Sequence, residues 1–176
     1  NDPEWQAKRN AFIGNTQKKS AVNCEGRYAN NDELKYSLRS IELYAPWIRN
    51  IYIVTDNQTP SWLDTSNPKV KIIDHKEIMP AQSLPCFNSC LIEHFIHRIP
   101  GLAEHFLYGN DDMFFNKPVT PDMFFTTDGF PVIRFNRRPF RKFTLFFKEK
   151  ILKKTLSNYV QTIRNSANLV EKKYGI

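Results

Sequence analysis

The sequence Asn50-Ile-Tyr-Ile-Val-Thr-Asp56 decides the fold, because this short run of β-branched and aromatic residues ends in turn-forming residues. It predicts a buried strand followed by a loop. Upstream, Asn31-Asp32-Glu33 offers a helix N-cap with acidic residues in the first turn, and apolar residues recur at helical spacing over 34–45, which predicts an amphipathic helix that ends before Pro46. Downstream, residues 70–73 repeat the strand pattern and predict a second strand.

Two further elements are expected later in the chain. Residues 88–99 place apolar side chains along one stripe and are followed by Pro100-Gly101, which predicts a second helix. Residues 105–108 predict a third short strand. Strands that alternate with helical stretches predict an α/β fold with a mainly parallel sheet and flanking helices, because parallel strands require crossover connections.

Acidic residues follow each of the three predicted strands, and these are Asp56, Asp74 and the pair Asp111-Asp112. Ligands of such sheets bind beyond the carboxyl ends of the strands. The sequence therefore predicts a site at this edge. The structural alternative is that Asp and Asn simply favour turns, and that any strand ends in polar residues.

The sequence Asn110-Asp111-Asp112 offers hard oxygen ligands on one short loop. Mg²⁺ prefers one or two carboxylates together with phosphate oxygens and water, so Asp111 and Asp112 are the candidate metal ligands for Mg²⁺ or Mn²⁺. Asp74 and His75 form a candidate acid and base pair, because a His near its ordinary pKa accepts a hydroxyl proton.

The net charge of +7 is unevenly distributed. Residues 1–132 contain 13 Lys and Arg against 16 Asp and Glu, whereas residues 133–176 contain 12 against 2. We therefore expect an α/β core over 1–132 and a basic helical segment over 133–176 that packs on it. A basic helix with an apolar stripe also suits an anionic membrane surface. Nucleic acid is not the expected partner, because spaced Cys/His fingers and basic heptad regions are absent from the sequence.

Other classes of protein are disfavoured by missing signals. No apolar run approaches the roughly 20 residues that span a bilayer, and no phosphate-binding or dinucleotide-binding glycine motif is present. Three cysteines favour a reducing compartment and buried free thiols. His94 and His97 do not form a known zinc motif.

Three blocks of the sequence, residues 27–63, 70–80 and 84–115, resemble the second and longest conserved region of the Stealth family of hexose-1-phosphate transferases. Its members include bacterial capsule and exopolysaccharide phosphotransferases and the catalytic subunit of the animal enzyme that starts the mannose-6-phosphate tag. Residues 1–5 resemble the tail of the first family region, and 159–175 resemble the opening of the third. The resemblance therefore implies a partial nucleotide-sugar-binding core over 1–132, without the apolar strand and aspartate that precede this tail in the family.

The resemblance implies a Rossmann-like, glycosyltransferase-A-like core with a UDP-N-acetylhexosamine donor and a divalent metal. An acceptor glycan hydroxyl would attack the phosphate on the donor sugar, which gives a phosphodiester and releases UMP. In a bacterium this implies the cytoplasm or the inner face of its membrane, and in a eukaryotic relative the Golgi. The resemblance implies Asp111 and Asp112 as catalytic and metal-binding residues, and the acid and base pair His75 and Asp74 is added from the residues alone. The implied substrate-binding residues match the family motifs at Arg27, Asn31, Glu33, Arg39, Asp56, Asn57 and Asn110. Asn88 and Ser89 are further substrate-binding candidates, because they stand where a helix N-terminus could receive an anion.

Structural alternatives stay open for two of these residues. Arg39 suits a salt bridge on the helix surface, and Asn88 suits a plain N-cap. Two other functions also stay open. One is a metal-dependent glycosyltransferase that attacks the anomeric carbon and releases UDP, and the other is a truncated fragment that only binds nucleotide or anionic glycan.

Overall fold

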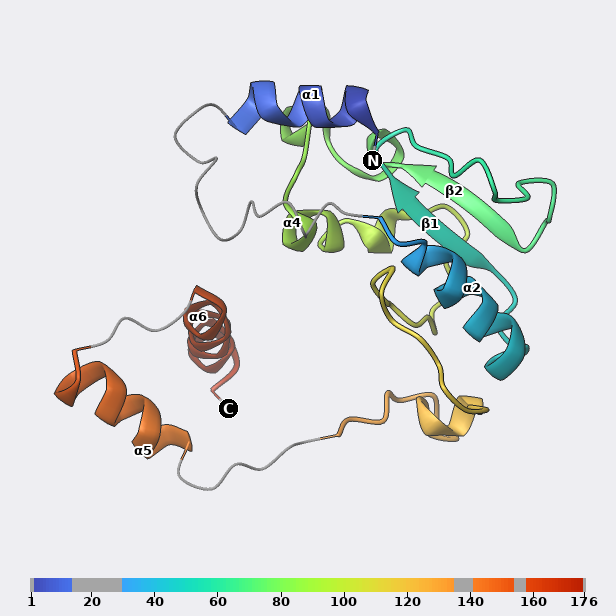
Figure 1. Cartoon of the computed structure of the whole chain (residues 1–176). Helices are drawn as coiled ribbons and strands as arrows, with labels where there is room; N and C mark the ends of the chain where they lie inside the picture. The colour runs from blue at the N-terminus through green and yellow to red at the C-terminus, as the bar shows by residue number, and fades with distance from the viewer. Residues whose placement is uncertain (1, 14–29, 135–140, 154–157, 176) are drawn as a thin grey trace. The chain divides into compact units, whose positions relative to one another are not determined.

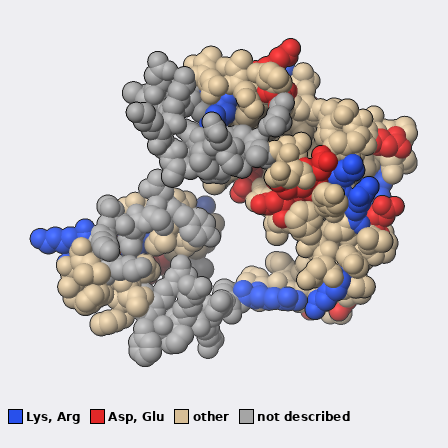
Figure 2. All heavy atoms as spheres, viewed as in Figure 1, with Lys and Arg blue, Asp and Glu red and all other residues tan. Residues whose placement is uncertain are grey.

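The computed structural model describes residues 2–13, 30–134, 141–153 and 158–175 (Figure 1). These fall into two compact units, residues 1–132 and residues 133–176, and we treat each separately. Arg27 and Cys24 lie outside the described residues. Both acidic and basic side chains occur on the visible surface of the first unit (Figure 2).

The first unit contains a parallel pair of strands, β1 (Ile51–Thr55) and β2 (Val70–Asp74). Ile51 pairs with Val70 and Thr55 with Asp74 in a regular register, and the strands lie side by side in Figure 1. Both predicted strands and their parallel pairing are confirmed. Among the described residues the sheet has only these two strands, so it is smaller than the sequence indicated.

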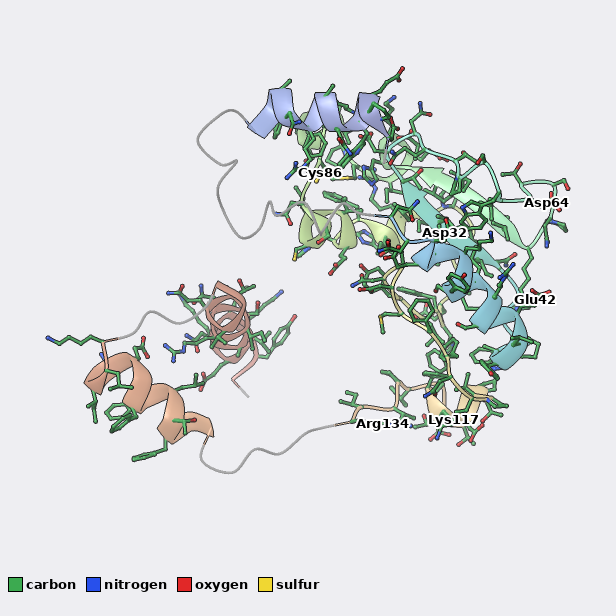
Figure 3. The ribbon with its side chains drawn as sticks, viewed as in Figure 1. Asp32, Glu42, Asp64, Cys86, Lys117 and Arg134 are labelled. Atoms are coloured by element: carbon green, nitrogen blue, oxygen red, sulfur yellow. The ribbon has the colours of Figure 1, made fainter. Side chains whose placement is uncertain are left out.

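Helix α2 (Glu33–Tyr44) confirms the helix predicted before β1. It begins after Asp32, whose φ of 63° is left-handed and whose side chain makes no capping hydrogen bond. The carboxylate of Glu33 accepts the backbone N–H of Asn31 instead, at 2.7 Å. The helix ends where the N–H of Ala45 bonds to the carbonyl of Ile41, one residue before Pro46. Asp32 and Glu42 mark this helix in Figure 3.

The helix predicted over residues 88–99 is interrupted. Helix α4 covers only Ser89–Glu93, and a 3₁₀ turn, η4 (Ile96–Arg98), follows it. The ring Nδ1 of His94 lies 2.6 Å from the carbonyl oxygen of Cys90, the group that the backbone N–H of His94 would bond in a continuous helix. The chain then tightens into i to i+3 bonds, beginning with Phe95 N–H to the carbonyl of Ile92.

The strand predicted over residues 105–108 is not formed. These residues have no regular secondary structure, and Phe106, Leu107 and Tyr108 are 43%, 37% and 52% exposed. A strand requires a hydrogen-bonded neighbour, and among the described residues this segment has none in a sheet. The local pattern therefore predicts the wrong element, because pairing is not a local property.

The core lies around Ile78, whose side chain is fully buried. Ile78 ends α3 (His75–Ile78), the short helix that directly follows β2, and a 3₁₀ turn, η3 (Ala81–Ser83), comes next. The other buried members of this cluster are Ile73, Met79, Cys86 and Ile99. Cys86 (labelled in Figure 3) is a buried free thiol, as predicted, whereas Cys90 is a free thiol that is exposed.

Two further segments pack within the first unit. Helix α1 (Pro3–Ile13) places Trp5 and Phe12 against Phe87, with ring centroids 5.5 and 5.4 Å apart. Later in the chain, the N–H of Val119 donates to the carbonyl of Tyr44, and the carbonyl of Val119 accepts the indole N–H of Trp47. The 3₁₀ turn η5 (Pro121–Met123) follows.

The second unit consists of α5 (Arg141–Phe146), a π-helical turn, η6 (Phe147–Ile151), and α6 (Asn158–Tyr174). Arg164 on α6 bonds to both carboxylate oxygens of Glu149, at 3.1 and 3.2 Å. None of the helices in the described ranges has the length and apolar character needed to cross a membrane. That this segment packs on the core, or that it binds an anionic membrane, stays a prediction.

Candidate functional site

A cavity of about 1050 Å³ lies along β1 and is called the edge cavity here. Its walls come from β1, α2, the region of α4 and the chain from Leu102 to Phe115. Four of the predicted site residues line it, namely His75, Ser89, Asn110 and Asp111. The structure therefore brings the end of β2, the start of α4 and the Asn-Asp loop to one cavity.

The Asn110–Asp112 loop is anchored to α2 by two buried serines. The hydroxyl of Ser37 donates to the carbonyl of Met113 at 2.8 Å, and the N–H of Phe115 donates to the hydroxyl of Ser40 at 3.0 Å. Ser40 in turn donates to the carbonyl of Ser37 at 2.7 Å. Both serines are 7% exposed, so water does not readily replace these bonds. The chain just after the loop is thereby held at a fixed place on α2.

Tyr108, Glu93 and Asn110 form a polar cluster where the Asn110–Asp112 loop begins. The hydroxyl of Tyr108 lies 3.0 Å from Oε1 of Glu93 and 3.0 Å from Oδ1 of Asn110, and its single proton serves one of them at a time. Burial, and then the hydrogen bond and charge of Glu93, raise the pKa of Tyr108 to about 12. Tyr108 therefore stays a hydrogen-bond donor at neutral pH, and it orients the amide of Asn110.

His75 follows β2 directly and is 7% exposed. Its Nδ1 is buried and has no hydrogen-bond partner among the described residues. Burial lowers the pKa of His75, the charges of Asp56 and Asp74 oppose this shift, and the charge of Lys8 adds to it. The neutral imidazole is therefore favoured, and its unprotonated nitrogen is able to accept a proton.

Asp56 lies at the carboxyl end of β1 and is bound by Lys8 of α1. The Nζ of Lys8 contacts both carboxylate oxygens, at 2.7 and 2.9 Å. The Asp56 side chain is 7% exposed and that of Lys8 45%, so the ion pair is open on the lysine side only. Asn57 comes next, with a left-handed φ of 58°, and it is exposed outside the edge cavity.

Two predicted site residues form helix caps. Asp74 accepts the N–H of Lys76 at 2.8 Å, and Glu77 accepts the N–H of Asp74 at 2.7 Å, which completes a capping box for α3. Asn88 accepts the N–H of Cys90 at 3.1 Å and caps α4. These caps favour the structural interpretation of Asn88 and give Asp74 a structural role beside its predicted catalytic one.

Three other predicted residues lie on or near α2 and away from the lining of the edge cavity. Asn31 bonds to Glu33 through its side-chain amide at 3.0 Å, and the hydrogen bonds from Asn31 lower the pKa of Glu33. Arg39 is exposed, and its guanidinium lies 5.8 Å from the ring centre of Tyr36 on the same helix. The salt bridge suggested for Arg39 is not observed among the described residues.

Few side chains of the described residues are placed together to bind a metal ion. No group of three or more acidic, His or Cys side chains suited to a metal occurs in the described part of the chain. Asp111 lines the edge cavity, whereas its neighbour Asp112 is exposed outside the lining. This set fits a Mg²⁺ ion that takes most ligands from phosphate and water, and does not fit a closed all-protein site.

The edge cavity contains few positive charges. Among the described lining residues Arg49 is the only Lys or Arg, and it precedes β1, whereas Glu93 and Asp111 are acidic. A phosphate placed near Asn110 would therefore meet carboxylates rather than cations. A divalent cation between the carboxylates and the phosphate would remove this repulsion.

Sequence reasoning missed the residues that hold the site together. They are Lys8, Ser37, Ser40, Glu93 and Tyr108. A signal was available for Ser37, because it lies three residues after Leu34 and four residues before Ile41 of the apolar stripe of α2. No local signal pairs Lys8 with Asp56, which lies 48 residues away.

Comparison with known proteins gives one family and a consistent set of relatives. The model of Stealth protein CR2, conserved region 2, matches residues 27–133. An exopolysaccharide phosphotransferase of Streptomyces coelicolor is 50% identical over 131 residues, which are 73% of this chain and 22% of that protein. An exopolysaccharide phosphotransferase of Lactiplantibacillus plantarum is 48% identical over 130 residues, 74% of this chain and 37% of that protein.

A capsular polysaccharide phosphotransferase of Streptococcus pneumoniae is 44% identical over 132 residues, which cover 74% of this chain and 40% of that protein. The chain thus spans between about a fifth and two fifths of the length of these relatives. All of them are named phosphotransferases of extracellular or capsular polysaccharide.

Proposed function

This chain belongs to the Stealth family, and from that premise we propose that it forms the donor-binding part of a sugar-1-phosphate transferase of polysaccharide synthesis. The donor is a UDP-N-acetylhexosamine, and the acceptor is a hydroxyl of a surface polysaccharide. The acceptor oxygen forms a bond to the phosphorus that is attached to the donor sugar. The bond from that phosphorus to the UMP oxygen breaks, and UMP leaves with its electron pair.

The observation that supports this proposal most directly is the meeting of His75, Asn110 and Asp111 at one cavity. Asp111, with Asp112 and the amide oxygen of Asn110, would hold the divalent cation at the donor phosphates. When bound, Mg²⁺ or Mn²⁺ offsets the charge that develops on the phosphoryl group. The scarcity of Lys and Arg in the described lining makes such a cation the natural partner of the diphosphate.

His75 is the proposed general base. Its buried Nδ1 has no partner among the described residues, and its lowered pKa favours the neutral form that accepts a proton. The acceptor hydroxyl would give its proton to the neutral imidazole of His75, which lines the edge cavity, as the new bond to phosphorus forms. The Lys8–Asp56 ion pair lies near enough for its two charges to act on His75 in opposite directions.

The roles of the other predicted residues follow from their positions. Ser89, which begins α4, lines the same cavity as Asn110 and would contact the donor through its hydroxyl. Arg39 is exposed on α2 and would reach a phosphate only if the donor extended beyond the lining residues. A guanidinium would then bind phosphate oxygens bidentately.

The test is calorimetric titration of this chain with UDP-N-acetylglucosamine, with and without Mg²⁺. We expect binding that requires the metal, is lost in Asp111→Ala and is retained in Asp128→Ala, which removes an exposed carboxylate outside the edge cavity. Equal metal-dependent binding by the Asp111→Ala variant would contradict the assignment. In a turnover assay, release of UMP supports phosphate transfer, and release of UDP indicates glycosyl transfer instead.

A further inference from the structure

The second unit contains nearly half of the Lys and Arg residues of the chain and few acidic residues to balance them. Residues 133–176 contain 12 Lys and Arg, and the acidic residues among them are Glu149 and Glu171. Glu149 already has a cationic partner, because its carboxylate accepts two hydrogen bonds from Arg164 of α6, at 3.1 and 3.2 Å. Most of the positive charge of this unit therefore has no acidic side chain of the same unit to balance it.

The helical stretch formed by α5 and η6 has two different sides, because residues four apart lie on the same side of a helix. Leu145 and Glu149 are partly buried, and they lie on the side that α6 holds through its bond to Glu149. Phe143, Phe147 and Ile151 share the other side and are 64%, 40% and 58% exposed. The stretch therefore turns its large apolar side chains outward and its acidic residue inward.

The outward side is called the aromatic face here, and it consists of Phe143, Phe146, Phe147, Lys150 and Ile151. The rings of Phe143 and Phe147 lie together, with their centroids 6.4 Å apart. Phe146 is 55% exposed and stands four residues before the exposed Lys150, so a cation shares the face with three phenyl rings. Exposed apolar side chains gathered in this way mark a surface that binds a partner.

The partner has to suit both the phenyl rings and the cations. A soluble polyanion would use the positive charges but would leave a face of phenyl rings and isoleucine in water. An apolar protein surface would cover the rings but would strip water from Lys150 without replacing it. An anionic lipid bilayer meets both needs, because its headgroups attract lysines while the boundary to the acyl chains accepts phenyl rings.

We propose that the aromatic face binds the surface of an anionic lipid bilayer. Phe143, Phe147 and Ile151 enter the boundary between headgroups and acyl chains, and the ammonium groups of Lys150 and Lys153, both exposed, stay at the level of the lipid phosphates. The bond between Arg164 and Glu149 assists this contact, because it keeps a carboxylate neutralised and away from the negative surface. This inference does not rest on the proposed catalytic activity.

Co-sedimentation with lipid vesicles tests the proposal on this chain and on the longest polypeptide that the gene encodes. The vesicles contain phosphatidylcholine alone or phosphatidylcholine with about 30% phosphatidylglycerol, which supplies the negative surface charge. We expect binding to the anionic vesicles, at least about 10-fold weaker binding to the neutral ones, and a decline with added salt. Equal binding to both kinds of vesicle, or no binding to either, would overturn the proposal.

Two double variants separate the apolar contribution from the charge. We expect Phe143→Ser with Phe147→Ser to weaken binding to anionic vesicles by about 10-fold or more, and Lys150→Gln with Lys153→Gln to do the same. Phe130→Ser and Lys117→Gln change exposed residues of the first unit, are the matched controls and should bind as the parent does. Unchanged vesicle binding by the phenylalanine variant would show attraction of polyanions by charge alone and would refute insertion.

A tryptophan placed in the aromatic face gives a second measurement that does not depend on affinity. Phe147→Trp puts the indole on the proposed lipid contact, and Phe130→Trp puts one at an exposed position of the first unit. With saturating anionic vesicles, lipids brominated on their acyl chains should quench the fluorescence of Phe147→Trp and leave that of Phe130→Trp unchanged. If the longest polypeptide shows no such quenching at position 147, another part of the protein covers the face and the proposal is wrong.

Discussion

Replacing Ser40 by alanine tests whether α2 holds the site loop. Ser40 is buried, and its hydroxyl is the acceptor for the N–H of Phe115 at 3.0 Å. Removing the hydroxyl leaves that partly buried N–H without a partner, which costs about 1–3 kcal/mol. Alanine has the higher helix propensity and returns about 0.5 kcal/mol. We therefore expect the free energy of unfolding to fall by roughly 0.5–2.5 kcal/mol.

The measurement is urea denaturation followed by tryptophan fluorescence, with Trp47 inside the affected unit. The sign of the change is decisive, because a serine that served only as a helix residue would give a variant more stable by about 0.5 kcal/mol. Glu42→Ala on the exposed face of α2 is the matched control and should stay within about 0.5 kcal/mol of the parent. A Ser40→Ala protein as stable as the parent, or more so, would refute the anchoring role.

The same substitution should act on binding, because Phe115 lies three residues beyond Asp112. We expect weaker metal-dependent binding of the UDP-sugar by Ser40→Ala, although Ser40 itself is not proposed to touch the donor. Ser37→Ala removes the neighbouring bond to Met113. Since Ser40 also donates to the carbonyl of Ser37, we expect the two substitutions to be non-additive by about 0.5 kcal/mol or more.

Three other predictions follow from the described contacts. The pKa of His75 is lower in the folded protein than in the unfolded chain, so the contribution of His75 to stability is complete above the unfolded pKa near 6.5 and declines as the pH falls below that value. The urea midpoint of the parent should therefore drop more steeply between pH 7.5 and 5 than the midpoint of His75→Gln. Parallel curves for the two proteins would contradict this prediction. Tyr108→Phe should remove the ultraviolet titration component with a pKa of about 12, and a component that persists would reassign it. Ile78→Ala should cost roughly 2–5 kcal/mol in denaturation because this side chain is fully buried, and a loss below about 1 kcal/mol would show that the core collapses around the gap.

The elements that could be predicted are those that local sequence determines. Helix α2 and strands β1 and β2 have apolar periodicities of their own, and the structure places them within one or two residues of the predicted bounds. The prediction of a strand over residues 105–108 was wrong, because a strand depends on a partner elsewhere in the chain. The predicted helix over 88–99 failed because the His94 side chain competes for a backbone carbonyl, which periodicity does not reveal.

Sequence reasoning selected some residues of the candidate site and missed others, because only some of them have a local signal. Sequence reasoning selected His75, Asn110 and Asp111, because polar residues after strand-like runs are recognisable locally, and the structure brings them to one cavity. It did not find the contact of Lys8 with Asp56 or that of Tyr108 with Glu93, since both join separate elements. Asp74 and Asn88 were selected as site residues, but both form helix caps, because a residue type that suits ligand binding also suits a helix cap.

The pairing of β1 with β2 has a consequence for how the protein begins to fold during synthesis. Ile51 meets Val70 only nineteen residues later, so the pair closes a short loop at small entropic cost and can form as soon as both strands have left the ribosome. The opposite edge of β1 has no such nearby partner among the described residues. Until it is covered, the nascent sheet presents an open edge to other chains, so expression yield should depend more on temperature and chaperone supply than on the stability of the finished fold.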